Sequence, residues 1–553
     1  MGNQHSSLQK EGYKITKETD KYIIVTKDFD IFFIKKLHQK DDKELASSNE
    51  ALKKINHSHL LDIKGFKGGN HMSYMIMEYC QGGSLAKTIR KEHLDPFKEQ
   101  KILSWFVEII MALKALHEKG SPHKDLTPEN VFLNKFGIIR MGGFGITSES
   151  GLGGNQNKPI HYLPPETLTG GIYEEKSDIW SAGCILFELC TKQPAFSADT
   201  PVNLIPKIIS GPSPSLPEGF SPELCKLLSD MLEKNPENRP TAGEILAHPF
   251  VQTRLIEKCK TTVEELQTIL NTLRALADGL ENVHTRTCIG SLTGGVIGLL
   301  GGITTIVGVI LSPFTLGASI IVTGVGAGVG AVGGITASAS NITKTVKQTS
   351  QREAVDSIIK EFDQKTKAVV TWLQEIYAGL ETIGHINQQT LGNYGFNNET
   401  LKKAGFRAGR SLGVVSEAVR LGRFLSIGQC AAQTSRVVRV AGLATGILSG
   451  IFVAVDVFFI AMDAKEIHHI RQAKASTASD QNTLMSSPET EYRSSSVENI
   501  KSEIMKFVKS IRNFAGELQK VVDELKNVIS TIPEKDPEEE QDGITQNVEG
   551  END

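Results

Sequence analysis

A run of 57 residues, 287–343, contains no charged side chain and is crowded with glycine. A run of this length can supply two spans of roughly 20 residues, the length that the hydrocarbon core of a bilayer requires. The residues Ser312, Pro313 and Phe314 form the natural break between the two spans. We therefore expect a hydrophobic, glycine-rich helical hairpin over 286–343.

The charges that border this run predict its topology. Arg286 precedes it, and Lys344, Lys347 and Arg352 follow it. Positive charge on both sides favours a hairpin whose two ends stay in the cytosol.

Glycines recur at a spacing of four residues in and beyond this run, which lets helix backbones approach closely in lipid. Glycine weakens a helix in water, so a fully buried hairpin in a soluble bundle remains the alternative. The uncharged run and its three rows of regularly spaced glycines favour membrane contact. The glycines are Gly290, Gly294, Gly298 and Gly302, then Gly324 with Gly328, then Gly326, Gly330 and Gly334, and later Gly442, Gly446 and Gly450.

A second apolar segment, 440–462, is interrupted by one charged residue, Asp456. A carboxylate in apolar surroundings favours its neutral form, and its charge opposes insertion. If the segment inserts, we expect it to insert more readily at acidic pH. Alternatively, Asp456 marks the aqueous end of a shorter helix.

Length, charge and cysteine usage narrow the class of protein. The 553 residues suggest two to four domains, and a net charge of −4 gives no reason to expect a nucleic-acid partner. The seven cysteines have no CxxC spacing, which argues against a zinc site and fits a reducing compartment. The N-terminus fits the pattern M-G-x-x-x-[ST], so we expect myristoylation at Gly2. It lacks a secretory signal, so we expect a location in the cytoplasm or on the cytoplasmic face of membranes, without secretion.

The first half of the chain alternates like a small β-rich lobe over 13–37 and becomes mainly helical from 99 to about 250. Its motifs are MEYCQGGSL (77–85), HKDLTPEN (123–130), GFG (143–145), YLPPE (162–166), SDIWSAGCILFEL (177–189) and ENRPTAGEILAHPF (237–250). In this order they resemble the NIMA-related serine/threonine protein kinases over about 13–252.

This resemblance implies roles for individual residues. It implies that Lys35 anchors phosphate, Asp125 is the base position, Asn130 is a metal ligand, and Glu78 and Cys80 are hinge positions beside ATP. It also implies that three further residues hold the fold, namely the ion pair Glu166–Arg239 and the loop-holding Asp178.

Several positions depart from the kinase pattern. Gly143 stands where the metal-binding aspartate is expected, so we expect no metal ligand there, and no glycine-rich phosphate loop precedes residue 65. Phe33 replaces a small residue of the adenine pocket. Further departures are Ser48 at the helix glutamate, although Glu50 is close, Thr127 at the catalytic lysine, Lys124 and Pro159. Because phosphoryl transfer needs metal, positioning and charge neutralisation, we interpret this half as a pseudokinase with no cofactor; ATP and Mg²⁺ are expected only if it is an active kinase.

The later sequence carries a second resemblance. LRALADGLENVH and the glycine-rich run to residue 330, followed by SRVVRVAGLATGILSGIFVAVDVFFIAMDAKEIHHIRQAK (435–474), resemble the apolipoprotein L family over about 262–530. This resemblance implies lipid or membrane association and pore-like activity, with roles in immunity or cell death. A single myristoyl chain binds membranes only marginally, so we expect a latent state in which amphipathic helices cover the hairpin.

The expected fold is multidomain: an α+β, bilobal, protein-kinase-like domain is followed by an all-α domain with a hydrophobic helical hairpin. Expected partners are membrane lipids and, through the kinase-like domain, proteins. The alternatives are an active membrane-anchored kinase and a scaffold that never enters lipid. The expected segments are 1–12 (myristoylation-like), 13–252 (kinase-like), 253–285 (connecting helix), 286–343 (hairpin), 344–473 (apolipoprotein-L-like helices, including 440–462), 474–496 (Ser/Thr-rich linker), 497–532 (amphipathic helix) and 533–553 (acidic tail).

Overall fold

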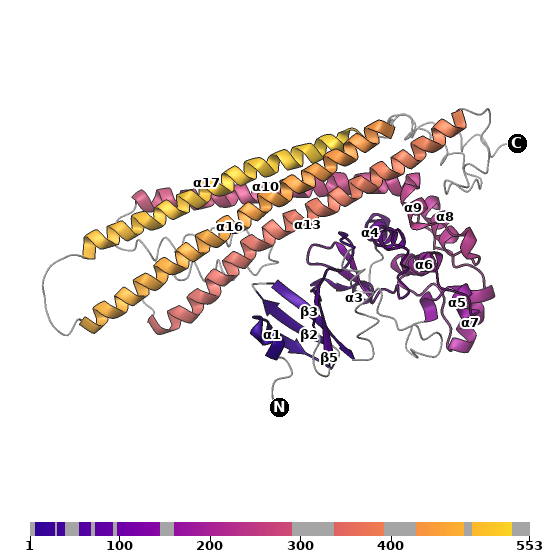
Figure 1. Ribbon diagram of the computed structural model, residues 1–553, viewed down its shortest axis with the longest axis horizontal. Helices are drawn as coiled ribbons and strands as arrows, with labels where there is room; N and C mark the ends of the chain where they lie inside the picture. Colours follow the sequence, from indigo (N-terminus) through magenta and orange to yellow (C-terminus); the bar gives the residue numbers. More distant parts are fainter. Residues whose placement is uncertain are drawn as a thin grey trace. The chain divides into compact units, whose positions relative to one another are not determined.

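The chain forms two compact units in the computed structural model (Figure 1). The first unit comprises Met1–Cys259, Thr371–Thr434 and Thr531–Asp553, and the second comprises Lys260–Val370 and Ser435–Ser530. The structure describes residues 6–20, 22–27, 30–38, 55–67, 72–91, 97–143, 160–289, 337–391, 427–479 and 489–532.

The first unit begins with a short helix and a five-stranded antiparallel sheet in the order β1-β2-β3-β5-β4. Alternating β-branched and aromatic residues favour these strands, as predicted from the sequence. The elements are α1 (Ser6–Lys10), β1 (Lys14–Glu18), β2 (Tyr22–Lys27), β3 (Asp30–His38), β4 (Ile63–Lys67) and β5 (Met72–Glu78).

The two faces of this sheet have different surroundings. One face buries Ile23, Val25, Ile34, Tyr74 and Ile76, and Leu8 of α1 completes this core with no exposed surface. The opposite face carries Met75 and Met77, and Phe33, Leu61 and Ile63 pack against them. Helix α1, which lies within the N-terminal segment 1–12, is therefore anchored in the small lobe.

A mainly helical lobe follows, built around α4 and α6. Twelve of the 19 residues of α4 are buried, which makes it the central helix of this lobe. Side-chain caps at Glu174 and Thr241 begin α6 and α9. The elements are β6 (Gly83–Ser84), α3 (Leu85–Lys91), α4 (Glu99–His117), β7 (Val131–Leu133), β8 (Ile139–Met141), η2 (Ile160–Tyr162), α5 (Pro165–Leu168), α6 (Glu175–Thr191), α7 (Pro201–Ser210), α8 (Pro222–Met231), η3 (Pro236–Asn238) and α9 (Ala242–Ala247).

Long helices make up the rest of the described chain: α10 (Pro249–Ile289), α13 (Ala337–Leu391), α16 (Ile427–Ser479) and α17 (Glu489–Ser530). Both α10 and α13 run through a boundary between the units, at 259/260 and 370/371. The predicted start of a connecting helix at 253 therefore falls inside α10.

In the second unit, stretches of these helices lie side by side and bury the apolar stripes that periodicity predicts (Figure 1). Helical periodicity of the sequence predicts one apolar stripe over 261–283 and another over 351–380, and all of their apolar positions with described side chains are buried. They are Val263, Leu266, Ile269, Leu270, Leu273, Leu276 and Leu280 in α10, and Ile358, Phe362 and Val369 in α13, while Trp372 and Ile376 of α13 are buried in the first unit.

The expected Ser/Thr-rich linker over 474–496 overlaps the ends of two helices. Helix α16 continues to Ser479 and α17 begins at Glu489. Ser and Thr cost a helix only a fraction of a kcal/mol each relative to alanine, so this composition does not by itself end a helix. Residues 290–336 of the expected hairpin, Gly2 and the acidic tail lie outside the described residues.

Candidate functional site

Asp178, near the start of α6, is fully buried and organises the loop that contains Asp125. Its carboxylate accepts hydrogen bonds from the backbone N–H groups of His123 (2.6 Å) and Lys124 (3.1 Å). The side chains of His117 and Tyr173 contact it at 2.9 and 2.8 Å. Burial lowers the pKa of His123, although the Asp178 charge opposes this. The buried carboxylate thus fixes the backbone immediately before Asp125.

Glu166 and Arg239 form a bidentate ion pair in the helical lobe. Nη1 and Nη2 of the fully buried guanidinium each lie 2.7 Å from one carboxylate oxygen. Ser177 donates to the same carboxylate at 2.7 Å, and the Arg239 group lies 5.1 Å from the centre of the Trp180 ring. Burial opposes ionisation of Glu166, but the hydrogen bonds from Arg239 outweigh it and lower the pKa. The pair ties α5 to the segment after α8.

Asp125, Asn130 and Gly143 lie together at the end of this loop. The Asn130 amide donates to the Asp125 backbone oxygen at 2.8 Å and to its carboxylate at 3.0 Å. Gly143 has a φ of +84°, and a Cβ added there would lie 2.6 Å from Asn130 Cγ. The space that a side chain at 143 would occupy is therefore filled by Asn130. An aspartate at 143 would require Asn130 to move.

Lys35 lies on β3, two residues after Phe33 and on the same face of the sheet. The Phe33 ring stacks on Tyr22 with centroids 5.0 Å apart, and it packs against Met75 and Met77. Aromatic and methionine side chains therefore cover this face beside Lys35. The contribution of Tyr22 was not anticipated from the sequence.

The connection between β1 and β2 is a tight turn. The backbone N–H of Thr19 donates to the Tyr22 oxygen at 2.9 Å. Lys36 donates from β3 to the Glu18 carboxylate at 2.6 Å and to the Thr19 oxygen at 2.8 Å. Oxygen atoms of this turn thus face a lysine, whereas a phosphate loop presents backbone N–H groups.

The hinge positions are engaged with protein. Glu78 accepts from the Asp62 N–H at 3.0 Å and lies 3.2 Å from Arg140. Cys80 is buried, and burial raises the pKa of its thiol. Thr127, in the loop of Asp125, is also buried. Ser48, Glu50 and Pro159 lie outside the described residues.

A polar cluster that sequence reasoning missed lies where α13 reaches the first unit. The Trp372 indole N–H donates to His59 Nε2 at 2.9 Å, and the two rings are parallel within 1°. Beside them, the Ser58 and Thr371 hydroxyl oxygens are 2.8 Å apart. The Trp372 contact surface is defined here as residues 57–60 with Glu108 and Lys114 of α4. The only sequence signal was that Trp372 falls on the apolar side of its helix.

Charges in this cluster are matched across three helices. Lys258 of α10 lies 2.6 Å from the buried Glu108 carboxylate and 4.6 Å from the centre of the Trp372 ring. Lys114 of α4 lies 2.9 Å from Glu375 of α13. Burial raises the pKa of Glu375, and Lys114 opposes this shift.

The histidines of this cluster are held in their neutral form. Burial is the main cause that lowers the pKa of His57 to about 4, with Arg140 and Lys114 adding to the effect. Burial also lowers the pKa of His59, aided by His57 and Arg140.

In the second unit, ion pairs attach α16 to its neighbours. Asp456 pairs with Arg352 of α13, and Arg436 pairs with Glu524 of α17, with a 2.8 Å contact from Nη2. Asp456 is half exposed, at 50%. Its carboxylate is therefore neutralised at the surface of the helix rather than isolated among apolar groups.

The glycine row of α16 is used at one position. A Cβ added at Gly450 would lie 2.9 Å from the Phe514 ring of α17, whereas a Cβ added at Gly442 or Gly446 would meet no other described residue within 4 Å. Among the described residues, close helix approach at these three positions is therefore seen at Gly450.

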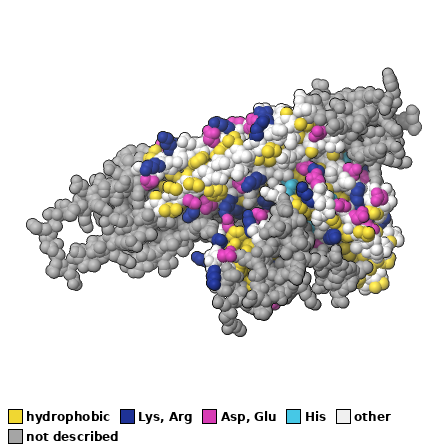
Figure 2. Space-filling model, viewed as in Figure 1, with side chains coloured by type: hydrophobic (Ala, Val, Ile, Leu, Met, Phe, Trp, Pro, Cys, Tyr) yellow, Lys and Arg dark blue, Asp and Glu magenta, His cyan; other side chains and the backbone are white. Residues whose placement is uncertain are grey.

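Helix α16 also carries an outward apolar face. Within the described residues, Gly428–Ala461 is one helical stretch whose length and composition would suffice to cross a membrane. Hydrophobic side chains lie among charged ones on the helices of the second unit (Figure 2). The exposed ones on α16 are Val438, Leu443, Val453, Val457 and Ile460, with exposures of 48 to 63%.

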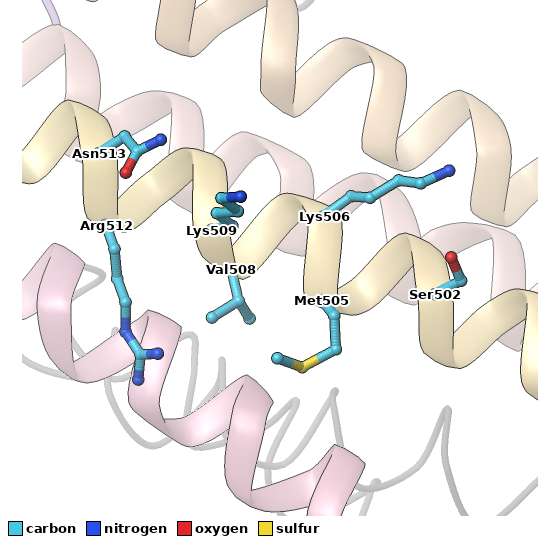
Figure 3. Close-up of a pocket in the computed structure, with 7 residues that line it drawn as sticks. All are labelled: Ser502, Met505, Lys506, Val508, Lys509, Arg512 and Asn513. Carbon is cyan, nitrogen blue, oxygen red and sulfur yellow. The ribbon is translucent and has the colours of Figure 1, made fainter.

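A cavity of about 500 Å³ in the second unit is lined by residues of α17 (Figure 3). Three of its residues are basic, but Lys506 pairs with Glu503 at 3.0 Å, and Arg512 extends to α10, where it pairs with Asp278 at 2.7 Å. The lining residues are Ser502, Met505, Lys506, Val508, Lys509, Arg512 and Asn513.

Comparison with known families assigns both halves. Residues 11–251 match the protein kinase domain, and residues 251–484 match Apolipoprotein L. The chain joins a protein kinase domain to an apolipoprotein L domain. Both resemblances and the predicted fold class are thereby confirmed.

The kinase domain is similar to several NIMA-related kinases. The chain is 36% identical to the serine/threonine-protein kinase Nek1 of Mus musculus over 226 residues, covering 40% of this chain and 19% of Nek1. It is 33% identical to mouse Nek4 over 231 residues (40% and 29%) and 34% identical to mouse Nek3 over 234 residues (41% and 46%). The matched stretch thus spans less than half the length of each of these relatives.

Proposed function

We propose that this protein associates with membranes through its apolipoprotein L domain and that its kinase domain is a regulatory pseudokinase. The pseudokinase proposal rests on the surroundings of Gly143. The Asn130 side chain fills the space that a side chain at 143 would occupy, and its amide donates a hydrogen bond to Asp125. Phosphoryl transfer depends on metal ions that neutralise the phosphate charge. Glycine supplies no carboxylate for such an ion.

The sheet above this loop supports the same proposal. Phe33, stacked on Tyr22 and packed against Met77, takes up room on the face that carries Lys35. The β1–β2 turn binds Lys36 instead of presenting N–H groups to a phosphate. Three parts of the nucleotide site therefore differ together from the kinase pattern: the metal ligand, the adenine pocket and the phosphate-binding loop.

Thermal unfolding of the full chain with ATP and Mg²⁺ or Mn²⁺ tests this proposal. A ligand at about 100 times its Kd stabilises a protein by about 2.7 kcal/mol. For a domain of this size, that corresponds to a rise in Tm of roughly 5–10 °C. We expect a rise below about 1 °C, and a metal-dependent rise in the larger range would contradict the pseudokinase.

An active serine/threonine kinase is the second candidate, and the retention of Lys35, Asp125 and Asn130 favours it. The holding contacts of Asp178 keep the Asp125 loop ordered, as catalysis would require. Phosphate transfer from ATP to a generic protein substrate, lost in Asp125→Asn and kept in an exposed control such as Lys226→Gln, would establish this alternative.

Membrane association is supported by the apolipoprotein L match and by the outward apolar face of α16. The apolipoprotein L family associates with lipids and membranes. We extend the proposal to pore-like activity in innate defence or cell death, on the strength of that resemblance. Myristoylation at Gly2 would add a weak anchor on the cytoplasmic face.

The ion pair between Arg352 and Asp456 suggests how a latent state is held. Burying an unpaired charge in lipid is costly, so α16 enters a bilayer more easily once Asp456 is protonated. We expect flotation with phosphatidylcholine and phosphatidylserine vesicles to increase at acidic pH, and Asp456→Asn to show the increase already at neutral pH. Equal flotation at both pH values would contradict the acid dependence, and no flotation at either would favour the non-inserting scaffold.

A further inference from the structure

We propose that the Trp372 contact surface is a helix-docking site occupied by residues 371–377 of this chain, and that through it the kinase domain restrains the apolipoprotein L helices. The second half of this statement rests on the proposed membrane function. The docking site lies in the first unit, and all of its contacts are between residues of that unit.

The site recognises a tryptophan by hydrogen bonding as well as by shape. His59 Nε2 accepts the indole N–H at 2.9 Å, so the neutral ring carries its proton on Nδ1. Nδ1 in turn lies 3.4 Å from the Ile139 backbone oxygen and 3.6 Å from the Glu108 carboxylate, both acceptors. Because both rings are almost fully buried, a side chain without a donor at 372 would leave His59 Nε2 unsatisfied.

Charge matching makes the site specific for one helix face. Glu375 lies one turn after Trp372 and meets Lys114 of α4. Lys258 neutralises the buried Glu108 and lies over the Trp372 ring. Undocking α13 would leave Glu375 and Lys114 without each other and would uncover the Trp372 ring and the Lys258 stem. The contact is therefore held by several mutually dependent groups.

Helix α13 provides the connection to α16. It runs without a break from Ala337 to Leu391, and it carries both Trp372 and Arg352, the partner of Asp456. Twenty residues of α-helix separate these two positions, a length of about 30 Å. A helix held at 371–377 cannot slide or rotate without breaking the contacts at that end. Docking therefore restrains the element that neutralises the charge of α16.

A reversible crosslink tests the proposal in the full chain. The Ser58 and Thr371 hydroxyl oxygens are 2.8 Å apart, so Ser58→Cys with Thr371→Cys should form a disulfide on treatment with diamide. We expect the oxidised double variant to lose vesicle flotation by about 10-fold and to regain it on reduction. Each single cysteine variant is a control, and diamide should not change its flotation with vesicles.

Three outcomes would overturn the proposal or separate it from the proposed function. Failure of the disulfide to form would show that α13 does not dock at this site. Formation of the disulfide with unchanged flotation would show that docking does not restrain membrane binding. If the reduced wild-type chain never floats with vesicles, the proposed membrane function fails. Amide hydrogen exchange then tests, without lipid, whether α13 docks at this site.

For that measurement, Trp372→Phe keeps the ring and removes the donor. We expect exchange at 371–377 to accelerate by about 10-fold, with a smaller acceleration in α16. Lys367→Gln, which removes the charge of a half-exposed lysine that pairs with Asp363 on the same helix, should change neither. Unchanged exchange in α16 with Trp372→Phe would rule out the restraint even without lipid.

Discussion

Two buried centres of the first unit use the same chemistry for different purposes. Asp178 of α6 accepts two backbone N–H groups from the loop that contains Asp125, the catalytic-loop position of a kinase domain, and it sits beside His117. At the Trp372 contact surface, Glu108 accepts the Ile139 backbone N–H at 2.7 Å and lies beside His59. Each centre is a carboxylate that fixes a loop next to a histidine.

The difference lies in where the remaining partners come from. The partners of Asp178 all belong to the kinase domain, between residues 117 and 178. Glu108 also binds Lys258, and His59 binds Trp372, and both of these partners follow the kinase domain in the chain. A buried histidine and carboxylate in a kinase domain therefore need not mark catalysis, because here one such pair binds residues that follow the kinase domain in the chain.

Removing each carboxylate separately sharpens this comparison and gives the largest expected effect. Asp178→Asn turns an acceptor into a donor that faces other donors, and Glu108→Gln leaves the Lys258 ammonium without its counter-charge. Breaking the buried Glu108–Lys258 pair costs about 3–5 kcal/mol, and each buried donor left unsatisfied around Asp178 costs about 1–3 kcal/mol, so the two losses are of similar size. Chemical denaturation should show a loss of this size in the free energy of unfolding of the first unit for both variants.

The two variants should differ in amide exchange at 371–377. Glu108→Gln should accelerate it beyond the change that global destabilisation causes, and Asp178→Asn should not. Equal acceleration in both variants would mean that the two centres are one cooperative unit and that the comparison is mistaken. Arg254→Gln, which removes an exposed pair with Glu257, is the control for surface charge.

The pH dependence of the free energy of unfolding should distinguish the same two centres, with a smaller effect. The folded-state pKa of His57, about 4, lies below the ordinary value of 6.5, so the unfolded chain binds more protons. The contribution of neutral His57 to the free energy of unfolding is therefore fully present above pH 6.5 and is lost as the pH falls toward 4. For His57 this loss is about 3 kcal/mol, and His59 acts in the same direction.

Burial also lowers the pKa of His123, so the catalytic loop contributes to the same acid loss. The difference between the wild-type chain and His57→Asn isolates the contact surface, because asparagine keeps an acceptor near the His59 N–H but does not titrate. We expect a flatter stability curve between pH 6.5 and 4 for the variant, measured by denaturation at each pH. Parallel curves would assign the acid sensitivity to other groups.

Local patterns in the sequence predicted the strands of the small lobe and the buried stripes of α10 and α13, because strand and helix periodicity is set by neighbouring residues. The contact between His59 and Trp372 joins residues 313 positions apart, and no local pattern encodes it. Similarly, Gly442, Gly446 and Gly450 have the same spacing, yet only Gly450 meets Phe514. At Gly143 the sequence indicated a missing carboxylate, but only the structure shows that Asn130 fills its place.

That observation leads to the smallest expected effect, which concerns the catalytic loop alone. Gly143→Asp restores the carboxylate, but it must displace Asn130 and adopt a φ near +84°, which costs a non-glycine residue about 1–2 kcal/mol. Phe33 and the Lys36-bound turn would remain. We therefore expect thermal unfolding of Gly143→Asp to show a change below about 1 °C on addition of ATP and Mg²⁺. A rise in Tm that appears only in the double variant with Phe33→Ala would show that the sheet face is a second barrier to nucleotide binding. A metal-dependent rise in Tm in Gly143→Asp alone would contradict this expectation and would show that the missing carboxylate was the only lesion.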